Sequence, residues 1–274
     1  MVLPFWRILF SAPAAGSWNM ALDEAILEAV TRGDQPPTLR LYAWEPACLS
    51  LGHAQPIADL DLEALASRGW QVVRRPTGGR AILHTDELTY SISAHQDNPV
   101  MTGGILESYR RISLALVRGL ETLGIDSHAD SQYALPTGSV QQAAVCFEVP
   151  SNYEITANGR KLIGSAQARR GLGVLQHGSL PLYGDLTRIT QVLNFSTPAE
   201  QAAASLRLLE HAATAEIILG TAPTWQQAAD AFSTAFSDQL QLKLEVSQPG
   251  EFELARAQAL EREKYANSAW TYRI

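Results

Sequence analysis

The order of the hydrophobic patterns constrains the fold of this chain more than any other feature of the sequence. Up to about residue 196, short apolar runs of strand length alternate with turns rich in Gly and Pro, and a few helical patterns interrupt them. From Thr197 onward, apolar residues recur at helical spacing. This order predicts an α+β (mixed α/β) fold, in which helices pack on a mixed sheet, and it lacks the regular alternation of a TIM barrel.

The same patterns predict a single domain over residues 1–274, with a sheet-rich core at 1–196 and a helical C-terminal segment at 197–274. A chain of 274 residues that is 46% hydrophobic buries a full apolar core without disulfides or metals. The expected helices lie at 19–30, 59–67, 104–123, 199–212, 225–240 and 251–265. The expected strands include 2–10, 39–42, 49–51, 70–73, 152–157, 161–167 and 174–180.

Turn and capping residues sharpen these expectations. Asn19 is expected to cap the first helix, and Gly33 to end it. Segments 81–83 and 88–93, joined by a short polar hinge, are expected to form a hairpin. A second hairpin is expected around 158–159, because Asn-Gly between two strand patterns is the strongest short hairpin signal.

Charge and cysteine content limit the partners and the setting. A net charge of −7 disfavours a general attraction to nucleic acid or to an anionic membrane surface. No run approaches the roughly 20 apolar residues of a membrane span, so we expect no membrane association. Cys48 and Cys146 match neither a disulfide framework nor a CxxC pattern, which fits a reduced, cytoplasmic setting. We expect a monomer.

The first candidate for chemistry is the turn at 74–80, which brings Arg74, Arg75 and Arg80 together around Thr77-Gly78-Gly79. Glycines let backbone N–H groups approach a ligand closely, and guanidinium groups bind anions. The turn therefore predicts recognition of an anion or a carboxyl group. The residues alone leave a solvated hairpin turn as the alternative.

Lys161 is the second candidate, because the chain has only three Lys among 21 Lys and Arg residues. It begins an apolar strand directly after a tight turn. An ammonium is a compact charge that can give up a proton, whereas a guanidinium stays charged. Its position therefore points to a site that needs an ammonium, with an ordinary turn charge as the alternative.

Cys146 is the third candidate, because it follows a long polar segment, 126–144, that we expect to be a surface loop. Lone cysteines are commonly buried and inert, and Cys48 in an apolar strand fits that description. A thiol that is partly exposed near a cation becomes a nucleophile, and His84 or His177 could serve as its base. No HExxH motif, CxxC pair or carboxylate cluster predicts a metal.

Taken together, the motifs resemble those of the lipoate-protein ligase and octanoyltransferase family. In chain order they are residues 19–24, 74–81 with His84 and 87–91, 159–167, and 176–180. Lys264-Tyr265-Ala266 and Trp270 are similar as well. The resemblance spans nearly the whole chain, and it implies the mixed α/β catalytic domain that this family shares with biotin-protein ligases.

The resemblance also implies roles for individual residues. Lys161 would lie at the acyl carbonyl of an octanoyl or lipoyl group. The motif residues expected to bind the substrate are Arg75, Thr77, Gly78, Gly79, Arg80, His84, Gly164, Ser165, Ala166, His177 and Gly178. Apolar side chains of Val72, Val73, Ile82 and Leu83 could surround the acyl chain.

Members of the family differ in how they activate the acyl group. Ligases form an acyl-adenylate with ATP, whereas transferases move the acyl group from a carrier thioester through a cysteine. The segment Cys-Phe-Glu-Val-Pro-Ser at 146–151 resembles the LipM-type octanoyltransferases, in which that cysteine is the nucleophile. The later Pro-Cys-Gly segment of LipB-type transferases is absent. Cys146 and Lys161 are therefore the expected catalytic residues, and no cofactor is expected.

The implied partners are octanoyl-acyl carrier protein as donor and a lipoyl-domain protein, such as glycine cleavage H protein, as acceptor. Such carriers are typically acidic, so a basic patch could dock them. Its expected members are Arg74, Arg75, Arg160, Arg169 and Arg170. Three alternatives remain open: an ATP-dependent lipoate-protein ligase that uses ATP and Mg, an amidotransferase between carrier proteins, and a non-catalytic lipoyl- or biotin-binding module.

Overall fold

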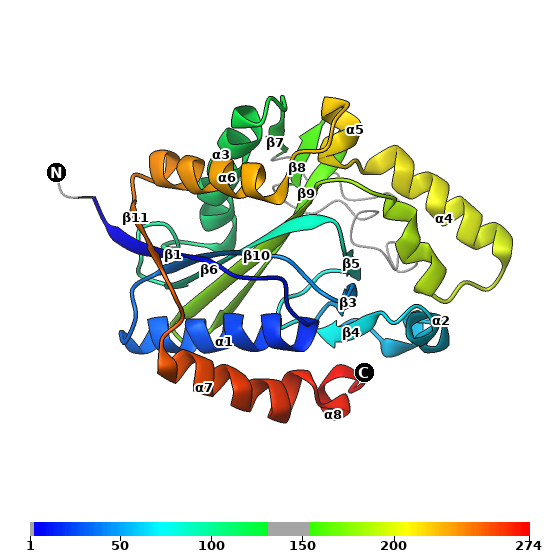
Figure 1. The fold of residues 1–274 in the computed structure, drawn as a ribbon, viewed down its shortest axis with the longest axis horizontal. Coiled ribbons are helices and arrows are strands. Elements are labelled where there is room, and N and C mark those ends of the chain that lie inside the picture. Colours follow the sequence, from blue (N-terminus) through cyan, green and yellow to red (C-terminus); the bar gives the residue numbers. More distant parts are fainter. Residues whose placement is uncertain (1–2, 131–153) are drawn as a thin grey trace.

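The fold is described by a computed structural model that covers residues 3–130 and 154–274 (Figure 1). Helices cover both faces of a twisted, mixed sheet, as the order of the sequence patterns predicts. The expected α+β class with helices packed on a mixed sheet is confirmed. None of the helices in these two stretches is both long and apolar enough to cross a membrane.

The large sheet contains eight strands within the described residues. In spatial order they are β11 (Lys243–Ser247), β1 (Phe5–Phe10), β2 (Thr38–Tyr42), β6 (Glu87–His95), β10 (Gly173–Pro181), β9 (Arg160–Arg170), β8 (Glu154–Ala157) and β7 (His128–Asp130). β1 pairs in parallel with β11 and β2, and the other neighbours pair antiparallel. β6 and β10 are buried along almost their whole length, because helices cover both faces.

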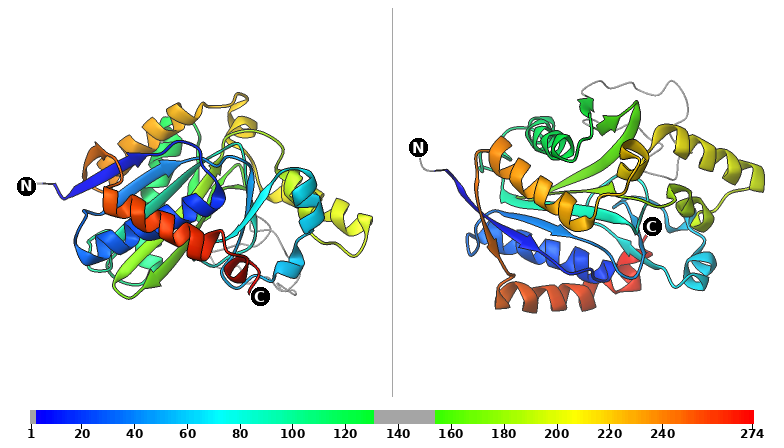
Figure 2. Two further views of the ribbon diagram at one scale, coloured as in Figure 1. Left: turned by 60° about the horizontal axis from the view of Figure 1, so that its bottom comes forward. Right: turned by 45° about the horizontal axis from the view of Figure 1, so that its top comes forward.

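Two pairs of helices cover the two faces. On one face α3 (Ile105–Thr122) packs against α6 (Trp225–Gln239), and on the other α1 (Gly16–Arg32) packs against α7 (Glu251–Leu260) (Figure 2). Leu116 and Phe232 belong to the core of the first face, and Ile26 and Ala257 to that of the second. Each helix thus buries the apolar stripe that the sequence predicts.

A smaller sheet has the order β4 (Gln71–Arg74), β3 (Cys48–Leu51), β5 (Ile82–His84). The expected hairpin of 81–83 and 88–93 is therefore wrong, because β5 pairs with β3 while β6 enters the large sheet. The polar hinge carries the chain from one sheet to the other. His84 and Glu87 are buried at this crossing, where their side chains bond to each other.

The helix start predicted at Asn19 is also wrong. α1 begins at Gly16, and the side chain of Asn19 is fully buried, with Nδ2 donating to the carbonyl oxygens of Ala14 and Ala43. The side-chain oxygen Oδ1, which a cap would use to accept a backbone N–H, instead accepts from Arg40 Nη2 at 2.7 Å. Two other signals are confirmed: Gly33 ends α1 at φ 80°, and Asn158 and Gly159 turn β8 into β9 at φ 51° and 75°.

The segment expected to be helical, 197–274, also supplies β11 at the edge of the large sheet. Its pattern, Lys-Leu-Glu-Val-Ser, has the alternation of a strand but only five residues. In the described stretches the remaining elements are α2 (Leu62–Ser67), α4 (Pro198–His211), α5 (Ala215–Leu219), α8 (Ser268–Thr271), two 3₁₀ segments (Ile57–Asp59 and Leu186–Val192) and a π-helical turn (Glu261–Tyr265).

A buried ion pair ties the C-terminal part to the first strand. Arg7 on β1 donates through Nη1 to Glu253 of α7 at 2.8 Å, and both side chains are at most 3% exposed. Glu253 also accepts from the N–H of Gly250 at the start of α7. The pair therefore fixes α7 against the edge of the sheet that β11 completes.

We predict that Arg7→Met lowers the free energy of unfolding by about 3–5 kcal/mol, because it leaves the Glu253 carboxylate buried without its partner. Urea denaturation followed by circular dichroism measures this change. The double variant Arg7→Met/Glu253→Gln, which keeps a hydrogen-bond acceptor for Gly250, should recover part of the loss. An equal loss in the single and double variants would contradict the role of the uncompensated charge.

Candidate active site

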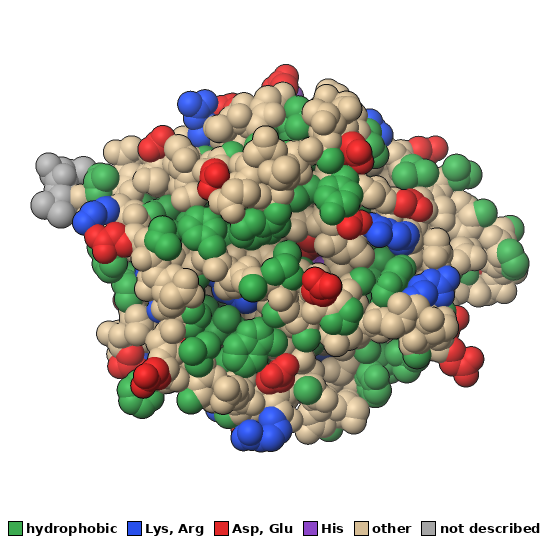
Figure 3. Space-filling model, in the orientation of Figure 1, with side chains coloured by type: hydrophobic (Ala, Val, Ile, Leu, Met, Phe, Trp, Pro, Cys, Tyr) green, Lys and Arg blue, Asp and Glu red, His purple; other side chains and the backbone are tan. Residues whose placement is uncertain are grey.

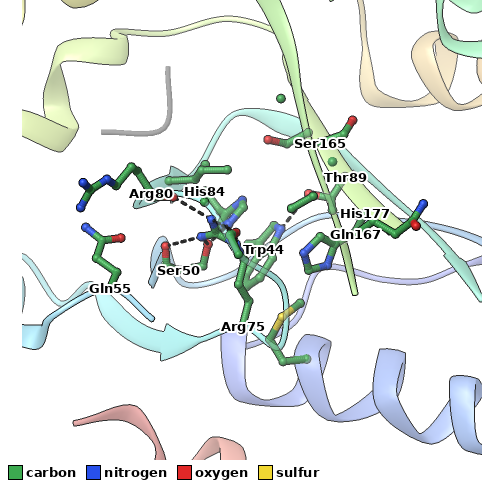
Figure 4. Close-up of a pocket in the computed structure, with 18 of the residues that line it drawn as sticks. Trp44, Ser50, Gln55, Arg75, Arg80, His84, Thr89, Ser165, Gln167 and His177 are labelled. Carbon is green, nitrogen blue, oxygen red and sulfur yellow. Dashed lines mark hydrogen bonds between the residues drawn. The ribbon is translucent and has the colours of Figure 1, made fainter. Parts of the chain in front are cut away.

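A cavity of about 550 Å³ lies between the small sheet, the turn after β4 and the face of the large sheet that carries α1 (Figure 4). This volume is typical of small-molecule sites. It is lined by the following motif residues expected to bind a substrate: Arg75, Gly78, Gly79, Arg80, His84, Gly164, Ser165, Ala166, His177 and Gly178. Segments far apart in sequence thus meet at one cavity, although a role in binding stays a prediction for each of them.

Strand register brings the last of these motifs together. β9 and β10 place Ala166 opposite His177 and Ser165 opposite Gly178, so residues 164–167 and 177–179 form one continuous wall. Thr77 does not line the cavity, but its Oγ1 bonds to His177 Nε2 at 2.6 Å. This bond joins the Gly-Gly turn to the large sheet.

Two hydrogen bonds and one stacked ring hold the imidazole of His84 in one orientation. Its Nδ1 bonds to Glu87 Oε1 at 2.7 Å and its Nε2 to Ser50 Oγ at 2.8 Å, while the ring stacks on Trp44 at 3.9 Å. An ionised carboxylate only accepts, so Nδ1 carries a proton. Arg75 Nη1 also donates to Ser50 Oγ, so the Ser50 hydroxyl connects His84 to the first cavity-lining arginine of the turn.

Of the three arginines of the turn, Arg75 and Arg80 line the cavity and Arg74 does not, so binding of an anion by this turn stays a prediction. The guanidinium of Arg74 is fully buried and donates to backbone carbonyls, and Arg74 does not line the cavity. Arg75 lines the cavity, but it donates to Ser50 O, Gly78 O and Arg80 O. The donors of Arg75 are thus used within the protein, because a guanidinium has only five N–H groups, whereas Nη2 of the buried Arg74 has no hydrogen-bond partner among the described residues.

Of the five arginines expected to dock an acidic carrier, Arg74 and Arg75 are buried, while Arg170 is exposed and Arg160 and Arg169 are partly exposed. Arg169 donates to the carbonyls of Met101 and Gly103, and Arg170 pairs with Glu24. Together with the buried Arg74 and Arg75, most of these arginines serve internal contacts. On the face in Figure 3, basic and acidic side chains are interspersed.

His177 connects the cavity to a buried ionic network. Asp23 is fully buried and accepts from Arg40 at 2.8 Å and from Tyr42 at 2.9 Å, and its Oδ2 lies 3.9 Å from His177 Nδ1. Burial alone would raise the pKa of Asp23, but Arg40 and His177 hold the pKa below its usual value. Burial lowers the pKa of His177, although Asp23 acts in the opposite direction.

A second polar row supports the β9 wall from the α3 side. Tyr90 bonds to Ser165 at 2.7 Å and accepts from Gln176 at 3.1 Å, and Gln176 accepts from Gln167 at 2.9 Å. Burial raises the pKa of Tyr90 to about 12, so its hydroxyl stays protonated. Gln167 also bonds to Ser108 of α3, which fixes the helix beside the cavity.

The two expected catalytic residues are placed differently. Lys161 lies on β9, three residues before the cavity-lining Gly164, and its ammonium is 3% exposed and paired with Glu154 of β8. Cys146 and most of the expected loop 126–144 lie outside the described residues. Cys48 is fully buried and its thiol pKa is raised by burial, in agreement with a packing role.

Comparisons with known proteins identify the family. Residues 15–237 match the family described as the lipoyl protein ligase A/B catalytic domain. The octanoyltransferase LipM of Kyrpidia tusciae is 40% identical over 98% of both chains, and that of Moorella thermoacetica is 45% identical over 78% of this chain and 79% of its own. The chain belongs to the lipoyl protein ligase A/B family.

Solved structures of family members share this fold. The bipartite lipoate protein ligase of Thermoplasma acidophilum aligns with a TM-score of 0.82 and 22% identity, covering 98% of this chain and 96% of that one. Lipoate-protein ligase A bound with ATP aligns with a TM-score of 0.79 and 24% identity over 98% of both chains. At these identities the likeness concerns the fold alone.

Several cavity residues of this family member carry no recognisable sequence signal. They are Tyr42, Trp44, Ser50, Gln55 and Tyr109, whereas Met20 and Thr89 lie within the family motifs. Of the apolar residues expected around an acyl chain, Ile82 lines the cavity, whereas Val72, Val73 and Leu83 do not. Glu154 precedes the Asn-Gly turn, so the sequence places it on the strand before the turn. Nothing in the sequence indicates that it pairs with Lys161. Within the described residues, no cluster of three His, Cys, Asp or Glu could hold a metal.

We predict that the stability of the protein falls between about pH 7 and pH 5 partly through His177. Its folded pKa lies below the usual 6.5, so the unfolded chain takes up a proton that the folded state excludes. Stability is therefore lost as the pH falls through that range, and His177→Gln should lose less. Urea denaturation at each pH, with the exposed His211→Gln as control, measures the difference. Parallel stability profiles for wild type and His177→Gln would contradict this.

Proposed function

We propose that this family member is a LipM-type octanoyltransferase. It takes an octanoyl group from octanoyl-acyl carrier protein and attaches it to a lysine of a lipoyl-domain protein, such as glycine cleavage H protein. The observation that carries the proposal is similarity at 36–40% identity, over nearly the full chain, to curated octanoyltransferases. The reaction serves lipoate biosynthesis, and we infer a cytoplasmic monomer that needs no cofactor.

In the proposed mechanism, the Cys146 thiolate attacks the carbonyl of the donor thioester and the carrier thiolate leaves. The amine of the acceptor lysine then attacks the enzyme thioester, an amide bond forms, and the Cys146 thiolate leaves. One thioester replaces another in the first step, so ATP is not needed. The second step yields an amide and is favourable.

The surroundings of Lys161 suit a role at the acyl carbonyl. Its ion pair with Glu154 holds the ammonium at a defined place near the part of β9 that lines the cavity. There it would donate a hydrogen bond to the oxyanion of each tetrahedral intermediate and pass protons between thiol and amine. The cavity, with Trp44, Ile82, His84 and Ala166 in its walls, would hold the octanoyl chain.

The decisive test is the intact mass of the protein after incubation with octanoyl-acyl carrier protein without ATP. We expect a hydroxylamine-sensitive octanoyl adduct on wild type and on Cys48→Ala, and none on Cys146→Ser. Cys48 is the matched control because it is the other cysteine of the chain. ATP-dependent acylation of a lipoyl domain by all three proteins, without an adduct, would make the protein a lipoate ligase instead. An adduct formed only from lipoylated carrier protein would indicate the amidotransferase.

Replacing Lys161 tests whether its ammonium takes part in the acyl-transfer steps. Lys161→Met is expected to lower kcat for octanoyl transfer by about 100-fold or more, the size expected for loss of an oxyanion donor. Lys161→Arg keeps a positive charge beside Glu154 but cannot exchange its proton, so it should also be slow. Single-turnover assays measure both steps, with circular dichroism as the folding control. Transfer by Lys161→Met within about threefold of wild type would rule out this role.

A further inference from the structure

Arg74 joins two segments that are far apart in sequence. Its Nε donates to the carbonyl of Thr271 at 3.0 Å, while Nη1 donates to the carbonyls of Gly52 at 2.9 Å and Gln55 at 2.6 Å. The guanidinium is fully buried. A planar fork can donate in two fixed directions at once, so the loop 52–57 and the C-terminal residues share one anchor.

The C-terminal residues also contact this loop directly. Arg273 donates to the carbonyl of His53 at 2.8 Å, and the N–H of Ile57 donates to the carbonyl of Ile274 at 2.8 Å. Trp270 closes the contact from the other side, because its Nε1 donates to the carbonyl of Arg74 at 2.9 Å. The last five residues thus both donate a hydrogen bond to the loop and accept one from it.

Trp270 is held between two cations. Arg273 lies 3.9 Å and Lys264 4.4 Å from its ring centre, and Lys264 also pairs with Glu24 of α1. His53 packs edge-on to the same ring. Cation–π contacts of this kind fix the indole in place. The C-terminal residues are therefore attached to α1 as well as to the loop.

The loop in turn supports the Gly-Gly turn. The N–H of His53 donates to the carbonyl of Thr77 at 2.8 Å, and the backbone at Gly52 approaches Gly79 so closely that an added Cβ would lie 1.9 Å from the Gly79 oxygen. Gln55 of the loop and Gly78, Gly79 and Arg80 of the turn all line the cavity (Figure 4). The loop has few bonds of its own, so its position depends on these contacts.

We infer that Arg74 and residues 270–274 form a clamp that positions the loop 52–57 and the turn 77–80 as one wall of the acyl cavity. Arg74 and Trp270 are positioning residues: they act on substrate binding through the loop and do not contact the cavity themselves. The effect on the octanoyl donor rests on the proposed function. The effect on the loop does not, and it can be measured without any substrate.

The first experiment is hydrogen exchange of the intact protein, read by mass spectrometry. Trp270→Ala should speed exchange in peptides covering 52–57 and 75–80 by about fivefold or more, the size expected for loss of one or two hydrogen bonds. The matched control is Tyr272→Ala, whose side chain is exposed in the same segment. Equal exchange in Trp270→Ala and wild type would overturn the clamp. If Trp270→Ala fails to fold, Trp270→Phe, which loses the N–H and part of the ring but keeps an aromatic face for Arg273 and Lys264, should show a smaller change in the same peptides.

The second experiment measures steady-state kinetics with whichever acyl donor the wild type uses. Trp270→Ala and Arg74→Lys should raise KM for the donor about fivefold to tenfold with kcat within about twofold, because they loosen a binding wall and leave the reacting groups in place. Trp270→Phe should lie between wild type and Trp270→Ala. A loss of kcat at unchanged KM would contradict a positioning role. If wild type uses lipoate and ATP instead of the octanoyl donor, the proposed function fails, and the same KM comparison still decides the clamp.

Discussion

The buried pair of Asp23 and Arg40 is the interaction on which the centre of this structure depends. Asp23 comes from α1 and Arg40 from β2, and neither side chain is more than 1% exposed. Two buried charges are stable only if their remaining hydrogen-bonding capacity is filled. Here Asp23 also accepts from Tyr42 and from Ser91 of β6, so one carboxylate joins the helix to two central strands. His177 on β10 lies next to it, and through Thr77 the network reaches the turn at the cavity.

The crossing between the two sheets gives the cavity its polar wall. His84 ends the small sheet and Glu87 begins a strand of the large one, so their hydrogen bond fixes one sheet relative to the other. The same histidine faces the cavity, and its ring is stacked on Trp44. The side chain of His84 is therefore already fixed by hydrogen bonds and stacking before a substrate binds. A side chain that is fixed in advance loses less conformational entropy on binding.

The sequence predicted the elements well where local chemistry decides them. The Asn-Gly turn, the αL glycine after α1 and the apolar stripe of α3 depend on neighbours within a few residues, and each is found where expected. It failed where distant partners decide. Asn19 looks like a cap, but its side-chain oxygen accepts from Arg40 of β2, and segments 81–83 and 88–93 look like a hairpin but belong to different sheets. The family motifs located most of the cavity wall, whereas Trp44 and Ser50 became visible only through their contacts with His84.

The preference of this chain for Arg over Lys has a physical explanation in the fold. Arg40, Arg74, Arg75 and Arg169 each donate to two or more groups on different segments, usually backbone carbonyls, which the fixed fork of a guanidinium allows. A Lys ammonium at these places would satisfy fewer of those carbonyls, and each unpaired buried carbonyl costs free energy. Two of the three guanidiniums around the turn, those of Arg74 and Arg75, thus hold backbone segments together, whereas Arg80 lines the cavity. Lys161, three residues before the cavity-lining Gly164, differs, since its buried ammonium pairs with the carboxylate of Glu154.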